Sequence, residues 1–425
     1  MVATEQVNDD SVRAAFSRAL DKAGIQDAKL GVAVSGGGDS VALLLLSHAW
    51  SKGRDCELQC ATVNHHLRDA ADAEALFVAS LCRELGIEHE TLSWDSAPAS
   101  GNLQGAARDA RRLLIGSWAR LQGLGAVLLG HTRDDQAETF LMRLGRGSGV
   151  DGLASMYPVE HDQGVDWVRP LLEVPRESLR KFLTSAGVGW CEDPGNEDDR
   201  FLRSRVRKAR RQLEELGLDQ ETLIATAGRM KQARFGLEVA TRELANTVAE
   251  PTLMGSVRID LEQCGNAPAE IRLRLLAHAL KWVSGSNYRP RLAALLRFEE
   301  ALYSGLGTTL SGCIAVHDNK GMAEVCREVS AMKVQPATSG VFDGRWRVKV
   351  PEELRESEVR PLGESGLRCC PDWKCQDSSR MAIMATPSFW LANELISAPL
   401  AGMRRGCDCF LENGVNSFFG SIVTH

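Results

Sequence analysis

The first 190 residues alternate between short apolar runs and amphipathic segments, and this alternation constrains the fold more than any other feature. Four segments are candidate strands: 30–34, 58–63, 88–93 and 126–129. Between them, three stretches place apolar residues at helical spacing: 41–52, 71–85 and 103–121. This order is typical of a parallel sheet with crossover helices on its faces. The pattern therefore predicts a doubly wound α/β domain.

The rest of the chain is predicted to add two smaller domains, because 425 residues exceed one ordinary core of ~150 residues. Residues 200–245 read as charged helix, with a break at Gly217, an N-cap at Asp219 and a second helix start at Gln220. Residues 268–282 and 289–302 also read as helices, and the signals weaken from about 341. We predict domains at 1–212, at 213–335 (mainly helical) and at 336–425 (small, α+β).

Composition argues against a membrane or secreted protein. The longest apolar stretch, Val41 to Leu46, is far short of the ~18 residues that begin to suggest a bilayer span. The first 30 residues mix acids and bases where a signal peptide needs an apolar run. We therefore expect a cytoplasmic protein with no membrane partner and with reduced thiols. A metal site is the alternative for five cysteines near the C-terminus, which have irregular spacing: Cys369, Cys370, Cys375, Cys407 and Cys409.

A glycine-rich loop lies between the first predicted strand and the apolar helix that follows. It reads Ser35-Gly36-Gly37-Gly38-Asp39-Ser40. Glycines let backbone N–H groups close around a phosphate, and the helix directs its positive end to the same place. The loop has neither the lysine of a Walker P-loop nor the spacing of a dinucleotide fold. Asp39 is placed to hold a magnesium ion that bridges phosphates. Simple helix capping is the alternative.

A second polar block follows the predicted strand at 126–129. If a helix starts near Arg133, Asp135 and Glu138 lie three residues apart on one face and can grip a cation. His131 lies at the carboxyl end of the strand, where open α/β sheets place ligands. The alternative for the acids is favourable charge at a helix N-terminus.

The sharpest charge feature is a reversal near residue 200, in a chain of net charge -6. The segment 191–199 carries five acids and no base, whereas 200–211 carries seven bases and no acid. The basic run is either a solvated linker helix or a face that contacts phosphates. Its arginines include Arg203, Arg205 and Arg207.

These motifs resemble those of a known family. The glycine-rich loop resembles the motif of the PP-loop ATP pyrophosphatases, and the block 130–156 closely resembles the tRNA(Ile)-lysidine synthetases. Further segments match that family in order: 63–68, 107–111, 169–172, 190–196 and 203–207. The resemblance is strong over 28–212 and weaker at 287–291, 310–313 and 360–364. Arg112 and Ser204 depart from the family pattern, which commonly has an aromatic residue and an asparagine there.

The resemblance implies that the chain uses ATP to join L-lysine to C2 of the first anticodon cytidine of tRNA(Ile) with a CAU anticodon. An adenylated tRNA intermediate forms, AMP and pyrophosphate are released, and codon reading changes from AUG to AUA. The family implies roles for residues of each motif: Ser35 to Ser40 bind ATP, Asp39 holds Mg²⁺, Arg111 and His131 stabilise charge at the α-phosphate, Asp135 and Glu138 bind lysine, and Arg203, Arg205 and Arg207 contact tRNA, with Arg205 nearest the chemistry. A homodimer is left open.

Three alternatives remain at this point. A tRNA thiolase related to the cytidine-thiolating enzymes would carry C-x-x-C pairs, and the sequence has none. A glutamine-hydrolysing synthetase would need an amidotransferase domain, for which no cysteine context is visible. A non-catalytic RNA-binding relic would have lost its polar site, whereas Asp39, His131, Asp135 and Glu138 are all present.

Overall fold

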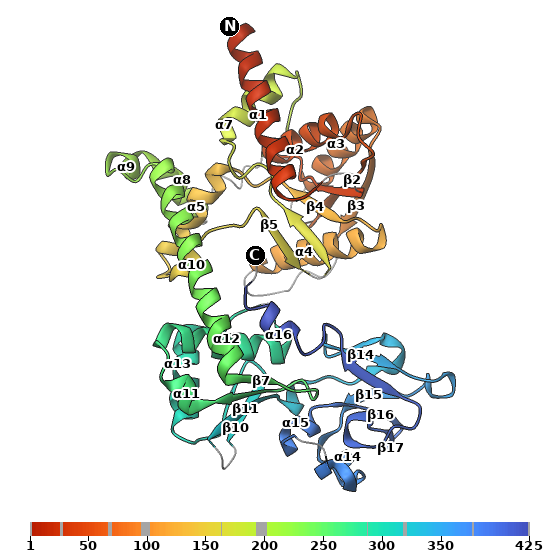
Figure 1. The fold of residues 1–425 in the computed structure, drawn as a ribbon. Coiled ribbons are helices and arrows are strands. Elements are labelled where there is room, and N and C mark those ends of the chain that lie inside the picture. Colours follow the sequence, from red (N-terminus) through yellow and green to blue (C-terminus); the bar gives the residue numbers. More distant parts are fainter. Residues whose placement is uncertain are drawn as a thin grey trace. The chain divides into compact units, whose positions relative to one another are not determined.

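The computed structural model divides the chain into two compact units, Met1–Gln232 and Ala233–His425 (Figure 1). The residues that the structure describes are 2–25, 29–66, 70–94, 103–162, 164–192, 202–286, 288–317, 321–375 and 378–423. The predicted domain boundaries after residues 212 and 335 stay predictions.

The first unit is built on a six-stranded sheet with the order β3-β2-β1-β4-β6-β5. Five strands are parallel, and β5 pairs antiparallel with β6 at one edge. The bounds are β1 (Lys29–Ala33), β2 (Glu57–Asn64), β3 (Glu88–Ser93), β4 (Ala126–Leu129), β5 (Val159–Asp162) and β6 (Val165–Val168). The chain builds outward from β1 to β3 and then returns to β4 on the other side of β1. This reversal is the switch point at which doubly wound sheets bind ligands.

Helices cover both faces of this sheet, as the alternation along the strands requires. Leu128 of β4 faces a core built with four helices: α1 (Val2–Lys22), α2 (Gly38–Ser51), α3 (Ala70–Leu85) and α7 (Arg176–Ser185). Val127, one residue earlier, faces the core under α4 (Leu103–Leu121). Helix α2 is apolar around most of its surface because it packs on the sheet and is also covered by α7. The predicted doubly wound fold is confirmed.

Further helices complete the first unit and lead into the second. Their bounds are α5 (Arg133–Leu144), α6 (Val150–Leu153), α8 (Leu202–Lys208), α9 (Arg210–Glu215) and α10 (Gln220–Val248). Gly217 adopts φ +77°, and the Asp219 carboxylate accepts a hydrogen bond of 2.7 Å from the Thr222 N–H. The predicted break and the predicted N-cap are therefore both present.

The second unit begins with a five-stranded antiparallel sheet of order β7-β8-β11-β10-β9. The strands are β7 (Ala249–Pro251), β8 (Val257–Asp260), β9 (Thr308–Leu310), β10 (Cys313–His317) and β11 (Met322–Arg327). Helices α11 (Leu261–Gly265), α12 (Ala269–Ser284) and α13 (Leu292–Tyr303) accompany them. Leu276 and Leu280 of α12 are fully buried in the shared core. The region predicted as mainly helical thus has helices packed on a sheet.

Two small antiparallel sheets make up most of the remaining chain. One contains β12 (Gln335–Pro336), β15 (Glu358–Pro361), β16 (Pro387–Leu391) and β17 (Glu394–Ser397), and the other contains β13 (Val341–Phe342), β14 (Trp346–Lys349) and β18 (Asp408–Leu411). Three short helices join them: α14 (Gly363–Arg368), α15 (Arg380–Met384) and α16 (Ser417–Gly420).

The last helix, α16, packs against α12. Phe418 is fully buried in the α12 core, and its carbonyl accepts a 2.8 Å hydrogen bond from His278 Nε2. Trp282 Nε1 donates to Ser417 Oγ at 3.0 Å. The C-terminal segment therefore belongs to the core that α12 organises. Within the described part of the chain, no helix combines the length and hydropathy needed to cross a bilayer.

Candidate active site

The glycine-rich loop connects β1 to α2 and has a fixed internal geometry. Gly36 adopts φ +86°, which only glycine takes without strain. The Ser40 hydroxyl accepts from the Ser35 N–H at 3.2 Å and donates to the Gly37 carbonyl at 2.8 Å. Gly37 is the N-cap of α2 and offers no side chain to satisfy the first N–H groups of the helix. The arrangement fits an anion such as a phosphate.

The end of β4 touches this loop at the switch point of the sheet. A Cβ on Gly130 would lie 3.2 Å from the Asp39 carbonyl carbon and 3.2 Å from Ser40 Cα. Real Cβ atoms rarely approach other atoms this closely, so Gly130 lets the two segments meet. His131 and the start of α5 thereby come to lie beside the glycine-rich loop.

Helix α5 begins with a capping box, and this device fixes Asp135. The N–H and the hydroxyl of Thr132 donate to Asp135 Oδ2 at 2.8 and 2.9 Å, and the Asp135 N–H donates back to the hydroxyl at 3.4 Å. One oxygen of Asp135, Oδ2, therefore has the structural role at the helix N-terminus that was the alternative to cation binding. Its other oxygen, Oδ1, lies with the Glu138 carboxylate among arginine side chains.

Arg176, which the sequence reasoning missed, joins the carboxylates of the two motifs. Its Nε donates to Asp39 Oδ2 at 2.8 Å, its Nη2 to Asp135 Oδ1 at 3.0 Å and its Nη1 to Glu138 Oε1 at 3.3 Å. Its backbone N–H donates to Asp134 Oδ2 at 2.8 Å. A signal for this residue was present: Arg176 is the first residue of α7, where a cation opposes the helix dipole unless acids surround it.

Helix α8 brings two of the three predicted tRNA-binding arginines to the same carboxylates. Arg203 lies 2.8 Å from Glu138 Oε2, and Arg207 Nε donates to Glu138 Oε1 at 2.6 Å. Arg205 is exposed on the same helix and has no ion pair with any residue that the structure describes. The structure thus brings Arg203 and Arg207 to the site and leaves Arg205 at the surface.

Burial and neighbouring charges together shift the pKa values of Asp39 and Asp135 in opposite directions. Burial raises the pKa of the Asp39 carboxyl above its ordinary value, although Arg176 opposes the shift. Burial alone would also raise the pKa of Asp135, but Arg176 and Arg203 outweigh it, and the pKa of Asp135 is lowered. Asp135 is therefore firmly ionised at neutral pH and suits the binding of a cation.

His131 is held as a neutral imidazole. Burial and the nearby Arg169 lower the pKa of His131 to about 4. Its Nδ1 is buried and has no hydrogen-bond partner in the described part of the chain. Such an orphaned atom at the carboxyl end of a strand is available to a ligand.

Arg111 lies outside the carboxylate cluster. Its Nη2 donates to His65 Nε2 at 3.1 Å, and the His65 ring packs edge-on against Trp94 at 5.5 Å. The family segments 107–111 and 63–68, which lie far apart in the sequence, thus meet at this contact. Of the family segments quoted above, residues 67, 68, 193–196 and 287 lie outside the described residues.

The segment after α7 contacts the glycine-rich loop and was also missed as part of the site. The Cys191 N–H donates to the Gly36 carbonyl at 2.9 Å. A Cβ on Gly38 would lie 3.4 Å from the Trp190 ring. The sequence signal for this segment was its match to the family segment 190–196, and the structure adds its contact with the glycine-rich loop.

The Asp39 carboxylate has one oxygen that is left for a magnesium ion. Asp39 Oδ2 is taken by Arg176, whereas the described residues supply no hydrogen bond to Oδ1. Carboxylate and phosphate oxygens are the donors that Mg²⁺ prefers.

At the other end of the chain, Cys370, Cys407 and Cys409 are buried. The described residues contain no group of three His, Cys, Asp or Glu side chains that could hold a metal ion.

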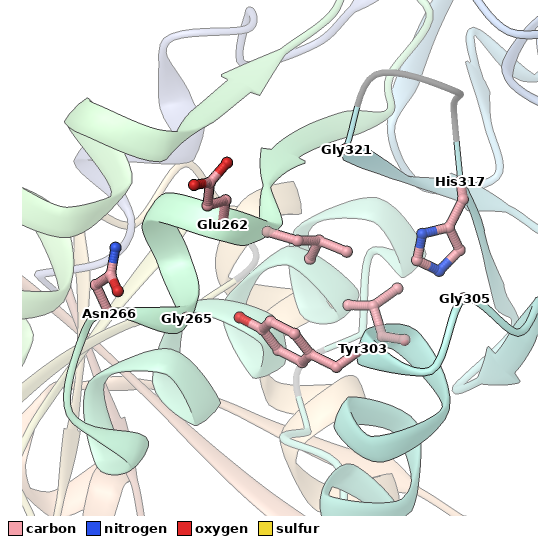
Figure 2. Close-up of a pocket in the computed structure, with 9 residues that line it drawn as sticks. Glu262, Gly265, Asn266, Tyr303, Gly305, His317 and Gly321 are labelled. Carbon is pink, nitrogen blue, oxygen red and sulfur yellow. The ribbon is translucent and has the colours of Figure 1, made fainter.

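A hollow in the second unit is separate from this cluster. It lies between α11, α13 and β10, and Figure 2 shows Glu262, Tyr303 and His317 on its walls. None of the predicted site residues lines it. The candidate site therefore rests on the charged groups of the first unit.

Comparisons with known proteins agree on the first unit and extend beyond it. A family model described as a PP-loop domain matches residues 9–213. The tRNA(Ile)-lysidine synthase of Ruegeria pomeroyi is 40% identical over 403 residues, which cover 93% of this chain and 94% of that protein. The protein of the same name from Wolbachia pipientis wMel is 36% identical over 303 residues, 70% of each chain. Among solved structures, the U34-tRNA thiolase NcsA from Methanococcus maripaludis matches with a TM-score of 0.48 at 17% identity, covering 54% of this chain and 80% of that one.

Proposed function

The chain belongs to the tRNA(Ile)-lysidine synthase family, and from this membership we propose that it joins L-lysine to C2 of the first anticodon cytidine of tRNA(Ile) with a CAU anticodon. ATP drives the ligation through the PP-loop domain. The C2 oxygen of cytosine is a poor leaving group, so the enzyme adenylates it first and releases pyrophosphate. The lysine ε-amine then displaces AMP. The modified anticodon reads AUA in place of AUG.

The nucleotide binds at the switch point of the sheet. The N–H groups of Gly36 to Ser40 and the N-terminus of α2 hold the phosphates. Asp39 would hold Mg²⁺, which would neutralise charge on the phosphates. The low pKa of His131 keeps its imidazole uncharged at neutral pH. The neutral ring still has one N–H group, which donates a hydrogen bond to the α-phosphate. Arg111 supplies the positive charge.

Lysine binds at Asp135 and Glu138 on α5. Two buried carboxylates on one helix face neutralise an ammonium group in a semi-enclosed site. The ε-ammonium must lose a proton before it attacks. One of the two carboxylates accepts this proton, and the lowered pKa of Asp135 makes Asp135 a weak base.

The tRNA contacts the basic face of α8 and the second unit. The exposed side chain of Arg205 supports a contact with a tRNA phosphate. Arg203 and Arg207 reach the tRNA from the edge of the carboxylate cluster. A cytoplasmic location suits an enzyme that consumes ATP and tRNA, and a homodimer is left open.

The observation that carries the proposal is the meeting of the glycine-rich loop with the α5 carboxylates across Gly130 and Arg176. The test is to incubate the purified protein with ATP, Mg²⁺, labelled L-lysine and total bacterial tRNA. We expect label in a minor isoleucine tRNA only. We expect Asp39→Ala to lower incorporation at least ~100-fold, since phosphate positioning supplies much of the rate.

The exposed Asp55 provides a matched control, because Asp55→Ala removes a carboxylate of the same unit at a surface turn. Pyrophosphate release without lysine incorporation would point to another PP-loop tRNA-modifying enzyme. No ATP turnover at all would favour the non-catalytic relic.

A further inference from the structure

The side chain of Arg176 spans both halves of the proposed site. Its three nitrogen atoms donate to three different carboxylates, at 2.8 Å to Asp39, 3.0 Å to Asp135 and 3.3 Å to Glu138. Asp39 lies in the first turn of α2, where the glycine-rich loop ends, and the other two belong to α5. One guanidinium therefore sets the spacing between the phosphate-binding segment and the lysine-binding segment.

The backbone that carries Arg176 is held in place. The Arg176 N–H donates to Asp134 Oδ2 at 2.8 Å, and the Arg133 N–H donates to the Val174 carbonyl at 3.0 Å. These reciprocal bonds lock the start of α7 to the start of α5. Leu179 and Leu183 of α7 are fully buried in the core of the first unit. The guanidinium thus projects from a rigid element, as a positioning group must.

The three-way contact uses a property that arginine has and lysine lacks. A guanidinium is planar, always charged and presents several N–H donors in a fixed fork. An ammonium is a single charged point on a flexible stem. A lysine at position 176 would keep the positive charge and lose the fork.

We propose that Arg176 is a positioning residue of the ligation step, which ties Asp39 to the Asp135–Glu138 pair and so fixes where the lysine amine lies relative to the bound nucleotide. The inference rests on the proposed function. Arg176 acts through the three carboxylates and has no covalent step of its own.

This role has a kinetic signature that differs from simple substrate binding. Misplacement of a reacting group by about 1 Å can cost ~100-fold in rate. Loss of the guanidinium also removes a cation that shares Asp135 and Glu138 with the substrate ammonium. The rate of ligation should therefore fall while the apparent affinity for lysine does not weaken.

The test compares Arg176→Gln and Arg176→Lys with the wild type in steady-state lysine incorporation and in pyrophosphate release. For both variants we expect kcat to fall ~10- to 100-fold and the KM for lysine to rise no more than about threefold. We also expect more pyrophosphate per lysine incorporated than in the wild type, because adenylated tRNA that meets no amine returns to cytidine and AMP by attack of water. Arg180→Gln is the matched control: Arg180 lies one turn along α7, is exposed, and pairs only distantly with Glu192 at 3.8 Å.

Three outcomes would overturn the inference. Wild-type kcat in Arg176→Lys would show that charge alone suffices. A large rise in the KM for lysine with unchanged kcat would make Arg176 a binding group, for example for the substrate carboxylate. If ATP turnover and the thermal midpoint fall to the same extent in Arg176→Gln as in Arg176→Lys, and the ratio of pyrophosphate to incorporated lysine is unchanged, the role of Arg176 is purely structural. If the wild type itself incorporates no lysine, the proposed function fails before any variant is compared.

Discussion

At the scale of single residues, the site depends on one position that has no side chain. Gly130 allows the end of β4 to lie against the backbone of Asp39 and Ser40. The sequence indicated a ligand-binding edge at this point because His131 follows a strand. It did not indicate the close contact, since nothing local to residue 130 reveals which loop will pack against it.

We expect Gly130→Ala to raise the KM for ATP ~10-fold or more and to destabilise the first unit by about 1–3 kcal/mol. The added methyl group must displace the Asp39 backbone, which is overpacking at the phosphate site. Gly125→Ala is the control at the other end of β4, because the nearest atom to its Cβ lies 4.0 Å away. Steady-state kinetics and thermal unfolding check both variants, and an unchanged KM for Gly130→Ala would contradict the contact.

The position of Arg176 shows where sequence reasoning about residues stops. The arginine lies 38 residues from Glu138 and 137 from Asp39 in the chain. The packing of α7 against α2, together with the hydrogen bonds between the starts of α7 and α5, brings these side chains together. Motif spacing identified the acids correctly as neighbours on α5, because residues three apart share a helix face.

At the scale of elements, the sequence predicted four of the six strands in the sheet of the first unit. The predicted strands at 88–93 and 126–129 have the observed bounds, and the other two differ by one residue at each end. Strands β5 and β6 were missed. Each has four residues, and β5 reads Val-Glu-His-Asp at the sheet edge, so it carries no apolar run. Pairing with β4 and β6 decides their conformation, which is a non-local effect.

The pairing of α8 with α5 leads to a prediction about tRNA binding. Glu138 holds Arg203 and Arg207, two of the arginines proposed to contact tRNA. We expect Glu138→Gln to abolish lysine incorporation and yet to tighten tRNA binding ~3- to 10-fold. The freed guanidinium groups would then contact one or two further phosphates, which steepens the salt dependence by about one to two units of slope.

Fluorescence anisotropy of labelled tRNA at several salt concentrations measures this effect. Glu215→Gln is the control, because its partner Arg211 is almost fully exposed and the pair is of the weak surface kind. Unchanged or weaker tRNA binding by Glu138→Gln would argue against a role of these two arginines on phosphate.

At the scale of the whole molecule, the folds of the two units differ in how well the sequence predicts them. The first unit was predictable because strands and helices alternate. The second was less so, because its strands are short and its chain returns to an earlier core: Phe418 packs against α12, about 140 residues upstream. Segment-by-segment reading has no means to predict such a return.

The contact between α16 and α12 makes the second unit sensitive to acid. Burial lowers the pKa of His278 to about 4, below its usual 6.5. Because the folded pKa is lower, the unfolded chain binds the proton first. Stability is therefore lost as pH falls from 6.5 towards 4, by about 2 kcal/mol at pH 5 from this group. We expect hydrogen exchange in α12 peptides to accelerate between pH 7 and pH 5, after correction for intrinsic rates.

The variant His278→Gln isolates this effect. It should be less stable than the wild type at pH 7, and the gap should narrow at pH 5, since glutamine does not titrate. A gap that stays constant between the two pH values would exclude His278 as the source.

The capping box of α5 has a consequence for how this protein can change over generations. The Asp135 carboxylate closes the helix with Oδ2 and pairs with Arg176 through Oδ1, where we propose that the substrate ammonium also binds. The same side chain therefore affects both the stability of α5 and the proposed catalysis. A mutation at position 135 changes both properties at once, so selection cannot act on either property alone. Substitution of Thr132 is limited in the same way, because only serine and threonine supply the hydroxyl group that holds Asp135 in place.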